Sequence, residues 1–258
     1  MGVRLLFDKV LAPALAAAGL RTADALFRLG GDPDLTSLVT MVDVPVDGTV
    51  GRFHLKRYHY PDWSKSKGLL GRGTGWGMAP ELREFKNLEF LREKGVSAVR
   101  PVAAAALTKS GRLVRHALLT EHIPDAIDLA KRLETRGDPV RDDPPTRRRV
   151  AELLGRLVHR MHMEAFTHRD LHARNVLVRV DEDGPALWTC DCRRGGPPSI
   201  GWKYIDDLAT LDIDLAPRWP REDRLAVFQA YAGQGEDAEA WAGAVGARSA
   251  RHAKAARK

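Results

Sequence analysis

Hydrophobic and polar residues alternate along several segments of the N-terminal half of the chain, which is the two-residue period of a half-buried β-strand. In one of these segments Phe53 and Leu55 share a face, and Lys56 occupies the opposite face. Hairpin-type turns separate neighbouring segments. The predicted strands are residues 35–44, 50–58, 99–108 and 112–121, with turns at Asp47-Gly48 and Ser110-Gly111.

Elsewhere the apolar residues recur at three- and four-residue spacing, which is typical of amphipathic helices. Pro80 opens one such segment and Gly95 ends it, with Leu82, Phe85, Leu88 and Leu91 forming its apolar stripe. The predicted helices are residues 2–18, a short one through Leu29 with Thr22 as N-cap, 80–94, 126–133 and 146–163, followed by two or three helices from Tyr204 onward.

A break at Ile123-Pro124-Asp125 divides the chain. Strands with one helix precede it, and mostly helices follow it, which predicts an α+β fold with two lobes. We expect an N-lobe over residues 1–123 and a helical C-lobe over residues 124–258. Within the C-lobe we expect a loop at Glu134–Pro145 and two short strands, Val176–Val180 and Ala186–Cys190.

Composition is that of an ordinary globular protein, with 44% hydrophobic and 29% charged residues in a chain of 258. The apolar run Val10–Leu20 is interrupted by Pro13 and is too short to span a bilayer. Asp8 disrupts the apolar stretch that a signal peptide would need. We therefore expect a cytoplasmic protein. Its two cysteines, Cys190 and Cys192, are expected to be reduced thiols, because one residue of spacing disfavours a disulfide.

Much of the net charge of +7 lies at the C-terminus, which carries Arg248, Arg251, Lys254, Arg257 and Lys258. Two interpretations stay open for this tail: an exposed, frayed end, or a segment that contacts an anionic membrane surface or nucleic acid. We favour the frayed end and expect no nucleic-acid partner, with peripheral contact to the cytoplasmic face of the inner membrane as the alternative.

The strongest chemical signal lies between residues 168 and 191. Asp170 follows a long predicted helix, in a loop where a carboxylate can accept the proton of a hydroxyl group. Asn175 ends that loop, and Asp191 ends the second of the two short strands that follow. The hairpin between them brings these two oxygen donors together, and such donors suit Mg²⁺. Phosphoryl transfer from ATP needs this set: a carboxylate for the acceptor hydroxyl, metal ligands, and cations along the phosphates.

The motif His168-Arg169-Asp170 with Asn175 resembles the catalytic loop of protein kinases, and His172 resembles the aminoglycoside-phosphotransferase branch. From about Leu20 to Leu215 the chain is most similar to the lipopolysaccharide kinase family, which phosphorylates Kdo or heptose sugars of the inner core. The features that carry this resemblance are Leu55-Lys56-Arg57-Tyr58, Arg83-Glu84-Phe85, Leu118 to Glu121, His168 to Val178, and Asp207-Leu208-Ala209.

The resemblance implies a two-lobed protein-kinase-like fold, ATP and Mg²⁺ as cofactors, and a sugar or glycolipid as the acceptor. It implies that Lys56 holds the α- and β-phosphates and that Glu84 pairs with it, with Glu81 as the rival partner one turn earlier. Glu121 is assigned to nucleotide binding as well. In the C-lobe it implies Asp170 as the catalytic base, Asn175 and Asp191 as magnesium ligands, and Asp207 as a brace under the catalytic loop.

Three departures from the protein-kinase pattern shape the functional hypotheses. The usual Asp-Phe-Gly is Asp191-Cys192-Arg193, and no clear glycine-rich loop is present. Fifteen residues separate Asp191 from Asp207, too few for the activation segment that holds a peptide. The short link favours a small or lipid-linked sugar. A kinase for another small molecule or a protein, and a nucleotide-binding pseudokinase, stay open as alternatives.

Several other side chains have a structural and a functional interpretation. His168 is expected to bond the backbone near Asp191, while His172 could either pack or contact the acceptor. His159 and His162 are not expected to bind a metal, because no third ligand is evident. The tryptophans that could line a sugar platform, although packing is the favoured role for most of them, are Trp63, Trp76, Trp202 and Trp219.

Overall fold

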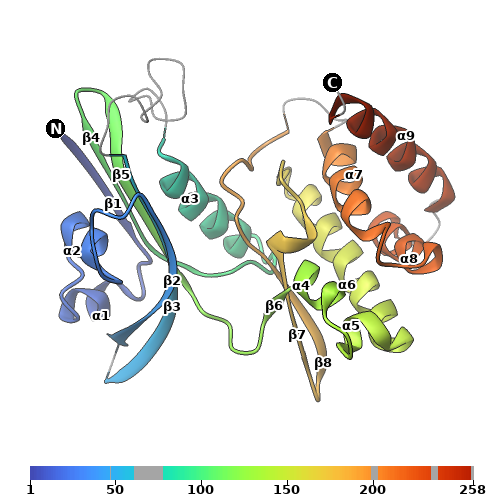
Figure 1. Ribbon diagram of the computed structural model, residues 1–258, viewed down its shortest axis with the longest axis horizontal. Helices are drawn as coiled ribbons and strands as arrows, with labels where there is room; N and C mark the ends of the chain where they lie inside the picture. Colours follow the sequence, from blue (N-terminus) through green and yellow to red (C-terminus); the bar gives the residue numbers. More distant parts are fainter. Residues whose placement is uncertain (47, 61–77, 199–202, 234–237, 257–258) are drawn as a thin grey trace. The chain divides into compact units, whose positions relative to one another are not determined.

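The computed structural model describes residues 1–46, 48–60, 78–198, 203–233 and 238–256. The chain forms two compact units (Figure 1). Unit 1 comprises Met1–Phe90 and Val99–Ile123, and unit 2 comprises Leu91–Ala98 and Pro124–Lys258. The expected division into an N-lobe over residues 1–123 and a C-lobe over residues 124–258 stays a prediction.

Unit 1 is built on a five-stranded antiparallel sheet with the order β1-β4-β5-β3-β2 (Figure 1). The strands are β1 (Gly2–Phe7), β2 (Ser37–Val46), β3 (Thr49–His59), β4 (Pro101–Lys109) and β5 (Arg112–Glu121). Four of them lie where the alternating pattern predicts them. The turn between β4 and β5 has positive φ at both Ser110 and Gly111, as a tight hairpin requires. Asp47 of the other expected turn lies outside the described residues.

The prediction of a helix over residues 2–18 is wrong for residues 2–7. Gly2–Phe7 form β1, which pairs with β4 from Gly2 opposite Thr108 to Phe7 opposite Ala103. Only Ala12–Ala17 are helical, as α1. A six-residue, mostly apolar segment is compatible with either structure, and the free edge of β4 decides for the strand because it supplies backbone hydrogen-bond partners.

The two faces of this sheet are covered by different helices. Helices α1 and α2 (Ala23–Arg28) pack on one face, where Leu15, Leu26 and Phe27 meet Phe53 and Leu55. Helix α3 (Pro80–Glu93) packs on the other face through Leu82 and Phe85, against Ala104, Ala106 and Leu118. The last residues of α3 group with unit 2. The alternation of β3 therefore turns Lys56 toward the face that α3 covers.

Unit 2 combines helices with a three-stranded sheet of order β6-β7-β8 (Figure 1). Its strands are β6 (Ile127–Asp128), β7 (Val176–Asp181) and β8 (Gly184–Thr189). Its helices are α4 (Leu129–Glu134), α5 (Pro139–Asp142), α6 (Pro144–Met163), α7 (Lys203–Leu215), α8 (Arg221–Ala232) and α9 (Ala238–Ala256), with a 3₁₀ turn, η1, at Ala173–Asn175. The mixed α/β content expected from the sequence is confirmed.

Two local expectations in unit 2 are corrected. The helix expected over residues 126–133 begins later, at Leu129, because residues 127 and 128 pair with β7 and the Asp128 side chain caps the helix at Lys131 N. The loop expected at Glu134–Pro145 contains the helical turn α5. Its N-cap is Asp138, which accepts a hydrogen bond from Val140 N and pairs with Arg132.

Helices α6 and α8 pack closely because Gly155 lacks a side chain. A Cβ built there would lie 2.2 Å from Val227 O and 2.8 Å from Ala230 Cβ.

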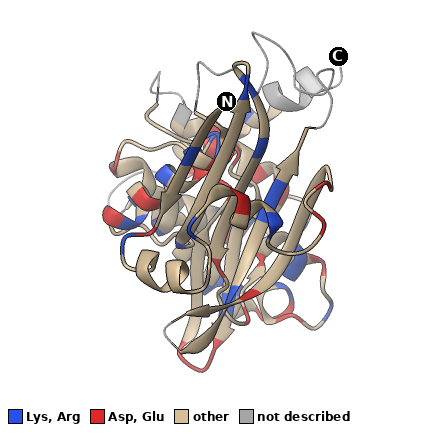
Figure 2. Ribbon diagram, turned by 90° about the vertical axis from the view of Figure 1, so that its left-hand side faces the viewer, with Lys and Arg blue, Asp and Glu red and all other residues tan. Residues whose placement is uncertain are grey.

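Basic and acidic residues are interspersed along the described ribbon (Figure 2). None of the described helices is long and apolar enough to cross a bilayer.

Candidate functional site

Unit 1 contributes a partly buried ion pair between β3 and α3. Lys56 Nζ lies 2.9 Å from Glu84 Oε1, and the Glu84 side chain is 2% exposed. The rival partner Glu81 also points inward, but it forms an ion pair with His116 of β5. The structure therefore selects Glu84 as the partner of Lys56. That Lys56 and Glu84 bind nucleotide phosphates stays a prediction.

Glu121 occupies the end of β5, where it pairs with Phe53 and its backbone N–H donates to Arg100 O. Arg100 itself donates two hydrogen bonds to Asp8. These bonds raise the pKa of Arg100, and the Glu121 carboxylate adds to that rise by charge attraction. The expected role of Glu121 in nucleotide binding also stays a prediction.

Unit 2 contributes the loop that carries Asp170, between α6 and β7. Asp207 of α7 fixes the start of this loop, because its carboxylate accepts hydrogen bonds from His168 N at 2.6 Å and Arg169 N at 2.7 Å. Arg169 has φ of 61°, in the sparsely populated left-handed region. The brace expected from Asp207 is confirmed, and it holds a strained backbone next to Asp170.

His168 joins the same loop to the strand end that carries Asp191. Its Nε2 lies 2.9 Å from Cys190 O, and the side chain is fully buried. Burial lowers the pKa of His168, so the ring is neutral and donates to the carbonyl from Nε2. The structural role expected for His168 is confirmed.

Asn175 and Asp191 are brought together by backbone hydrogen bonding. Cys190 N donates to Asn175 O at 3.0 Å, and Asn175 Nδ2 donates to Asp170 O at 2.7 Å. The second bond fixes the amide, which leaves Oδ1 as the acceptor end. Asp191 has φ of 53° and a side chain that is 27% exposed. An amide oxygen and a carboxylate tied to one loop are the hard donors that Mg²⁺ takes, so these residues fit the ion.

His172 is held by a residue that the sequence did not suggest. Asp214 Oδ2 accepts from His172 Nδ1 and from Ala173 N, each at 3.0 Å. Burial alone would raise the pKa of Asp214, but these two hydrogen bonds lower it overall. Asp214 lies seven residues after Asp207, so one face of α7 holds two points of the catalytic loop. That spacing was the only available sequence signal.

Three basic side chains surround the Asp170 carboxylate. His172 Nε2 and Arg194 Nη1 each lie 3.7 Å from Oδ1, and Arg174 Nη2 lies 3.8 Å from Oδ2. The Asp170 side chain is only 15% exposed. The roles of Arg174 and Arg194 could not be predicted from the sequence, since long exposed side chains follow no periodic pattern.

The remaining expectations concern histidine, tryptophan and cysteine. His162 lies between Tyr231 and Asp207, and His159 packs edge-on against Tyr231. Among the described residues, no three His, Cys, Asp or Glu side chains gather as a metal site. Trp219 is buried, and neither cysteine forms a disulfide. Trp63, Trp76 and Trp202 lie outside the described residues.

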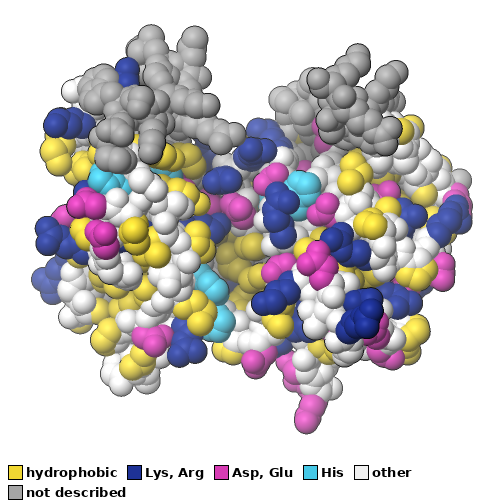
Figure 3. All heavy atoms as spheres, viewed as in Figure 1, with side chains coloured by type: hydrophobic (Ala, Val, Ile, Leu, Met, Phe, Trp, Pro, Cys, Tyr) yellow, Lys and Arg dark blue, Asp and Glu magenta, His cyan; other side chains and the backbone are white. Residues whose placement is uncertain are grey.

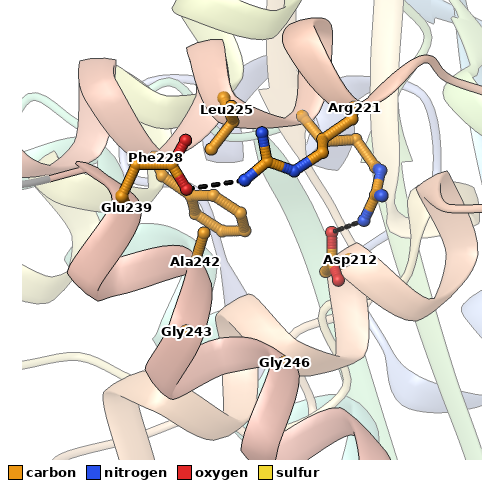
Figure 4. Close-up of a pocket in the computed structure, with 9 residues that line it drawn as sticks. Asp212, Arg221, Leu225, Phe228, Glu239, Ala242, Gly243 and Gly246 are labelled. Carbon is orange, nitrogen blue, oxygen red and sulfur yellow. Dashed lines mark hydrogen bonds and ion pairs between the residues drawn. The ribbon is translucent and has the colours of Figure 1, made fainter.

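A cavity of about 290 Å³ lies between α7, α8 and α9 (Figure 4). Ion pairs between Arg221 and Glu239, at 2.6 Å, and between Arg224 and Asp212, at 2.7 Å, lie at its edge. Its apolar lining residues are Leu225, Phe228 and Ala242. None of the expected site residues lines it, so it is separate from the catalytic loop.

Comparison with known proteins identifies the family of the chain. The model of the lipopolysaccharide kinase (Kdo/WaaP) family matches residues 74–231, which include Glu84 and the whole catalytic loop. A 3-deoxy-D-manno-octulosonic acid kinase of Vibrio cholerae is 33% identical over 118 residues, which are 46% of this chain and 45% of that one. The enzyme of the same name from Haemophilus influenzae is 30% identical over 129 residues, half of each chain. The chain thus spans about half the length of these curated relatives.

A solved structure described as WaaP in complex with acyl carrier protein is similar over 97% of this chain and 98% of that one. Its TM-score is 0.65 and its sequence identity 20%, so it bears on the fold alone. That fold is the expected protein-kinase-like one. The family model, which covers more than half of the residues, establishes that the chain belongs to the lipopolysaccharide kinase (Kdo/WaaP) family.

Proposed function

We propose that the protein is an ATP-dependent kinase that phosphorylates a hydroxyl group of a sugar in the lipopolysaccharide core, Kdo or heptose, or in a related glycolipid. The observation that carries this proposal is the catalytic loop. Asp207 and His168 fix its two sides, and Asn175 fixes the backbone of Asp170. Such preorganisation is what phosphoryl transfer requires of a protein.

Each residue then has one task in the reaction. Asp170 accepts a hydrogen bond from the acceptor hydroxyl and takes its proton as the oxygen attacks the γ-phosphorus of ATP. The bond from the γ-phosphorus to the bridging oxygen breaks, and ADP leaves with that electron pair. Lys56, held by Glu84, contacts the α- and β-phosphates. Asn175 and Asp191 would hold Mg²⁺, which neutralises charge on the phosphates when bound.

The choice of acceptor rests on two supports. The curated relatives carry the name of a kinase for 3-deoxy-D-manno-octulosonic acid, or Kdo. The fifteen residues between Asp191 and Asp207 leave little chain for a peptide platform. A cytoplasmic location with peripheral contact to the inner membrane would suit a glycolipid acceptor, and it stays a prediction.

The test is turnover of magnesium-ATP with purified Kdo-containing lipid A as the acceptor, read by mass spectrometry of the glycolipid. We expect a gain of one phosphate with the wild type and none with Asp170→Asn or Asp191→Asn. Arg156→Gln, which changes an exposed arginine on α6, is the control and should behave as the wild type. Wild-type turnover in either aspartate variant would contradict the proposal. A phosphate found on a soluble sugar or a protein instead would identify a different acceptor.

One observation favours a nucleotide-binding pseudokinase as the second candidate. Arg193 Nε lies 3.6 Å from Asp191 Oδ1. In an active kinase this carboxylate has to bind the metal, so the arginine would compete with the metal for it. Stabilisation by magnesium-ATP without turnover on any glycolipid, together with turnover gained in Arg193→Gly, would support this candidate.

A further inference from the structure

We propose that Arg174 and Arg194 form a binding site for an anionic group, a carboxylate or a phosphate, that the acceptor carries close to its reacting hydroxyl. The inference rests on the proposed function and deepens it, because it names residues that choose the acceptor. It assigns a task to two side chains that phosphoryl transfer itself does not require.

The two arginines approach Asp170 from different segments of unit 2. Arg174 lies in η1, four residues after Asp170, and Arg194 lies three residues after Asp191. Their contacts of 3.8 and 3.7 Å reach opposite oxygens of the carboxylate. Both distances exceed that of a hydrogen bond, so the N–H groups of these guanidinium ends are not donated to Asp170.

Close to Asp170, the two arginines outnumber the carboxylates that they contact. In the part of the chain that the structure describes, Asp170 is the acidic group within 4 Å of either arginine. Two guanidinium groups thus share one carboxylate, and the neighbouring His172 has its own partner in Asp214. Figure 3 shows basic, acidic and histidine side chains gathered in the upper part of unit 2. An added anion would be attracted to both arginines.

Exposure shows that the arginines are available to a ligand. Their side chains are 57% and 52% exposed, whereas Asp170 is 15% exposed. Each guanidinium carries a planar fork of N–H donors that matches a carboxylate or phosphate in two-point contacts. Because both lie within 4 Å of the residue that would receive the acceptor hydroxyl, an anion bound to them would hold that hydroxyl near Asp170.

The transferred phosphoryl group is the competing occupant, since it also passes close to the hydroxyl. The acceptor is favoured because Lys56 already provides a cation for the nucleotide, and because both arginines sit on segments that flank Asp170. The two occupants differ in one measurable respect. Arginines that stabilise the phosphoryl group also accelerate the slow hydrolysis of ATP by water, whereas arginines that bind the acceptor leave it unchanged.

The experiment uses the full chain and the variants Arg174→Gln, Arg194→Gln and the double variant. Arg156→Gln is the matched control, because that side chain is 49% exposed and lies 3.9 Å from its partner Glu152. The acceptors are Kdo-containing lipid A, its Kdo methyl ester and a form without lipid phosphates. For each single variant we expect KM for the charged acceptor to rise about tenfold, the effect of losing one charge-assisted contact, with KM for ATP and acceptor-free hydrolysis unchanged.

The modified acceptors identify the source of the anion. If the arginines bind the Kdo carboxylate, the methyl ester binds wild type and variants equally weakly. If they bind a lipid phosphate, the acceptor without lipid phosphates binds wild type and variants equally weakly. Arg194→Lys should recover part of the affinity, since it restores charge without the fork.

Two results would overturn the inference: an unchanged KM for the acceptor in the double variant, or acceptor-free hydrolysis that falls in step with turnover. Failure of the proposed function looks different, because the wild type then phosphorylates no glycolipid. In that event equilibrium binding of the charged glycolipid to wild type and double variant still decides, since equal affinities would refute the arginine site.

Discussion

Asp207→Asn is the substitution that most directly tests how the catalytic loop is held. The Asp207 carboxylate is buried and accepts hydrogen bonds from the backbone N–H groups of His168 and Arg169. It also lies 3.3 Å from His162 Nε2. An asparagine keeps the size of the side chain, but it offers one oxygen acceptor to these two N–H groups and turns an NH₂ donor toward the other.

The expected cost follows from these contacts. A hydrogen bond to a charged group contributes roughly 1.5–3 kcal/mol, and a buried donor without an acceptor costs about 1–3 kcal/mol. Since both effects act on one N–H group and overlap, we expect the free energy of unfolding to fall by about 3 kcal/mol. The left-handed backbone of Arg169 would also lose the contact that holds it, so Asp170 should move.

Urea unfolding of wild type and variant measures the stability, and hydrogen exchange measures the protection of the His168 and Arg169 amides. Turnover, under the proposed function, should fall at least about 100-fold, because small misplacements of a catalytic group have effects of that size. Asp24→Asn is the control: its ion pair with Arg28 is exposed, and the loss should stay below about 1 kcal/mol. Unchanged exchange at both amides, with stability within 0.5 kcal/mol of wild type, would refute the reasoning.

Three further changes test packing, ion pairing and protonation. Gly155→Ala should lower the free energy of unfolding by about 1–3 kcal/mol in urea titrations, because its Cβ would lie 2.2 Å from a backbone oxygen of α8; an unchanged midpoint would show that α6 and α8 can separate. Lys56→Met should abolish thermal stabilisation by magnesium-ATP, whereas Glu84→Gln should only weaken it. Asp8→Asn tests acid sensitivity: burial alone would raise the pKa of Asp8, but hydrogen bonds from Arg100 and the backbone lower it overall. The carboxylate therefore stabilises the fold fully above pH 3.8 and progressively less as pH falls through its folded pKa, so wild type should lose more stability than the variant below that pH.

Helices and strands whose formation depends on residues within or next to them could be predicted from the sequence. Helices α3 and α6 have apolar stripes and prolines in the first turn, and α6 has an N-cap at Asp143. Strand β1 was missed because its identity depends on β4, which lies about a hundred residues later in the chain. The short α5 was missed because its stability comes from the capping residue Asp138 and the contact to Arg132, and no periodic pattern exists over four residues.

The candidate site divides in the same way. Asp170, Asn175 and Asp191 belong to a motif whose spacing carries the geometry, and the structure ties them through backbone hydrogen bonds. Asp214 and Arg194 could not be found from spacing alone. Their contacts depend on how α7 is rotated and on the path of the chain after Asp191, both of which are set by packing.

That path after Asp191 connects the form of the loop to the choice of acceptor. Gly196 exchanges backbone hydrogen bonds with Thr167, at 2.9 and 3.0 Å, so the chain turns back at once onto the start of the catalytic loop. Gly195 allows the turn, because a Cβ there would lie 2.3 Å from the ring of Phe166. The residue before this turn is Arg194, which the turn holds 3.7 Å from Asp170. In protein kinases the segment after the metal-binding aspartate supports a peptide. Here the corresponding residues place a cation beside the Asp170 carboxylate. Under the proposed function, that arrangement suits a small anionic acceptor better than a polypeptide.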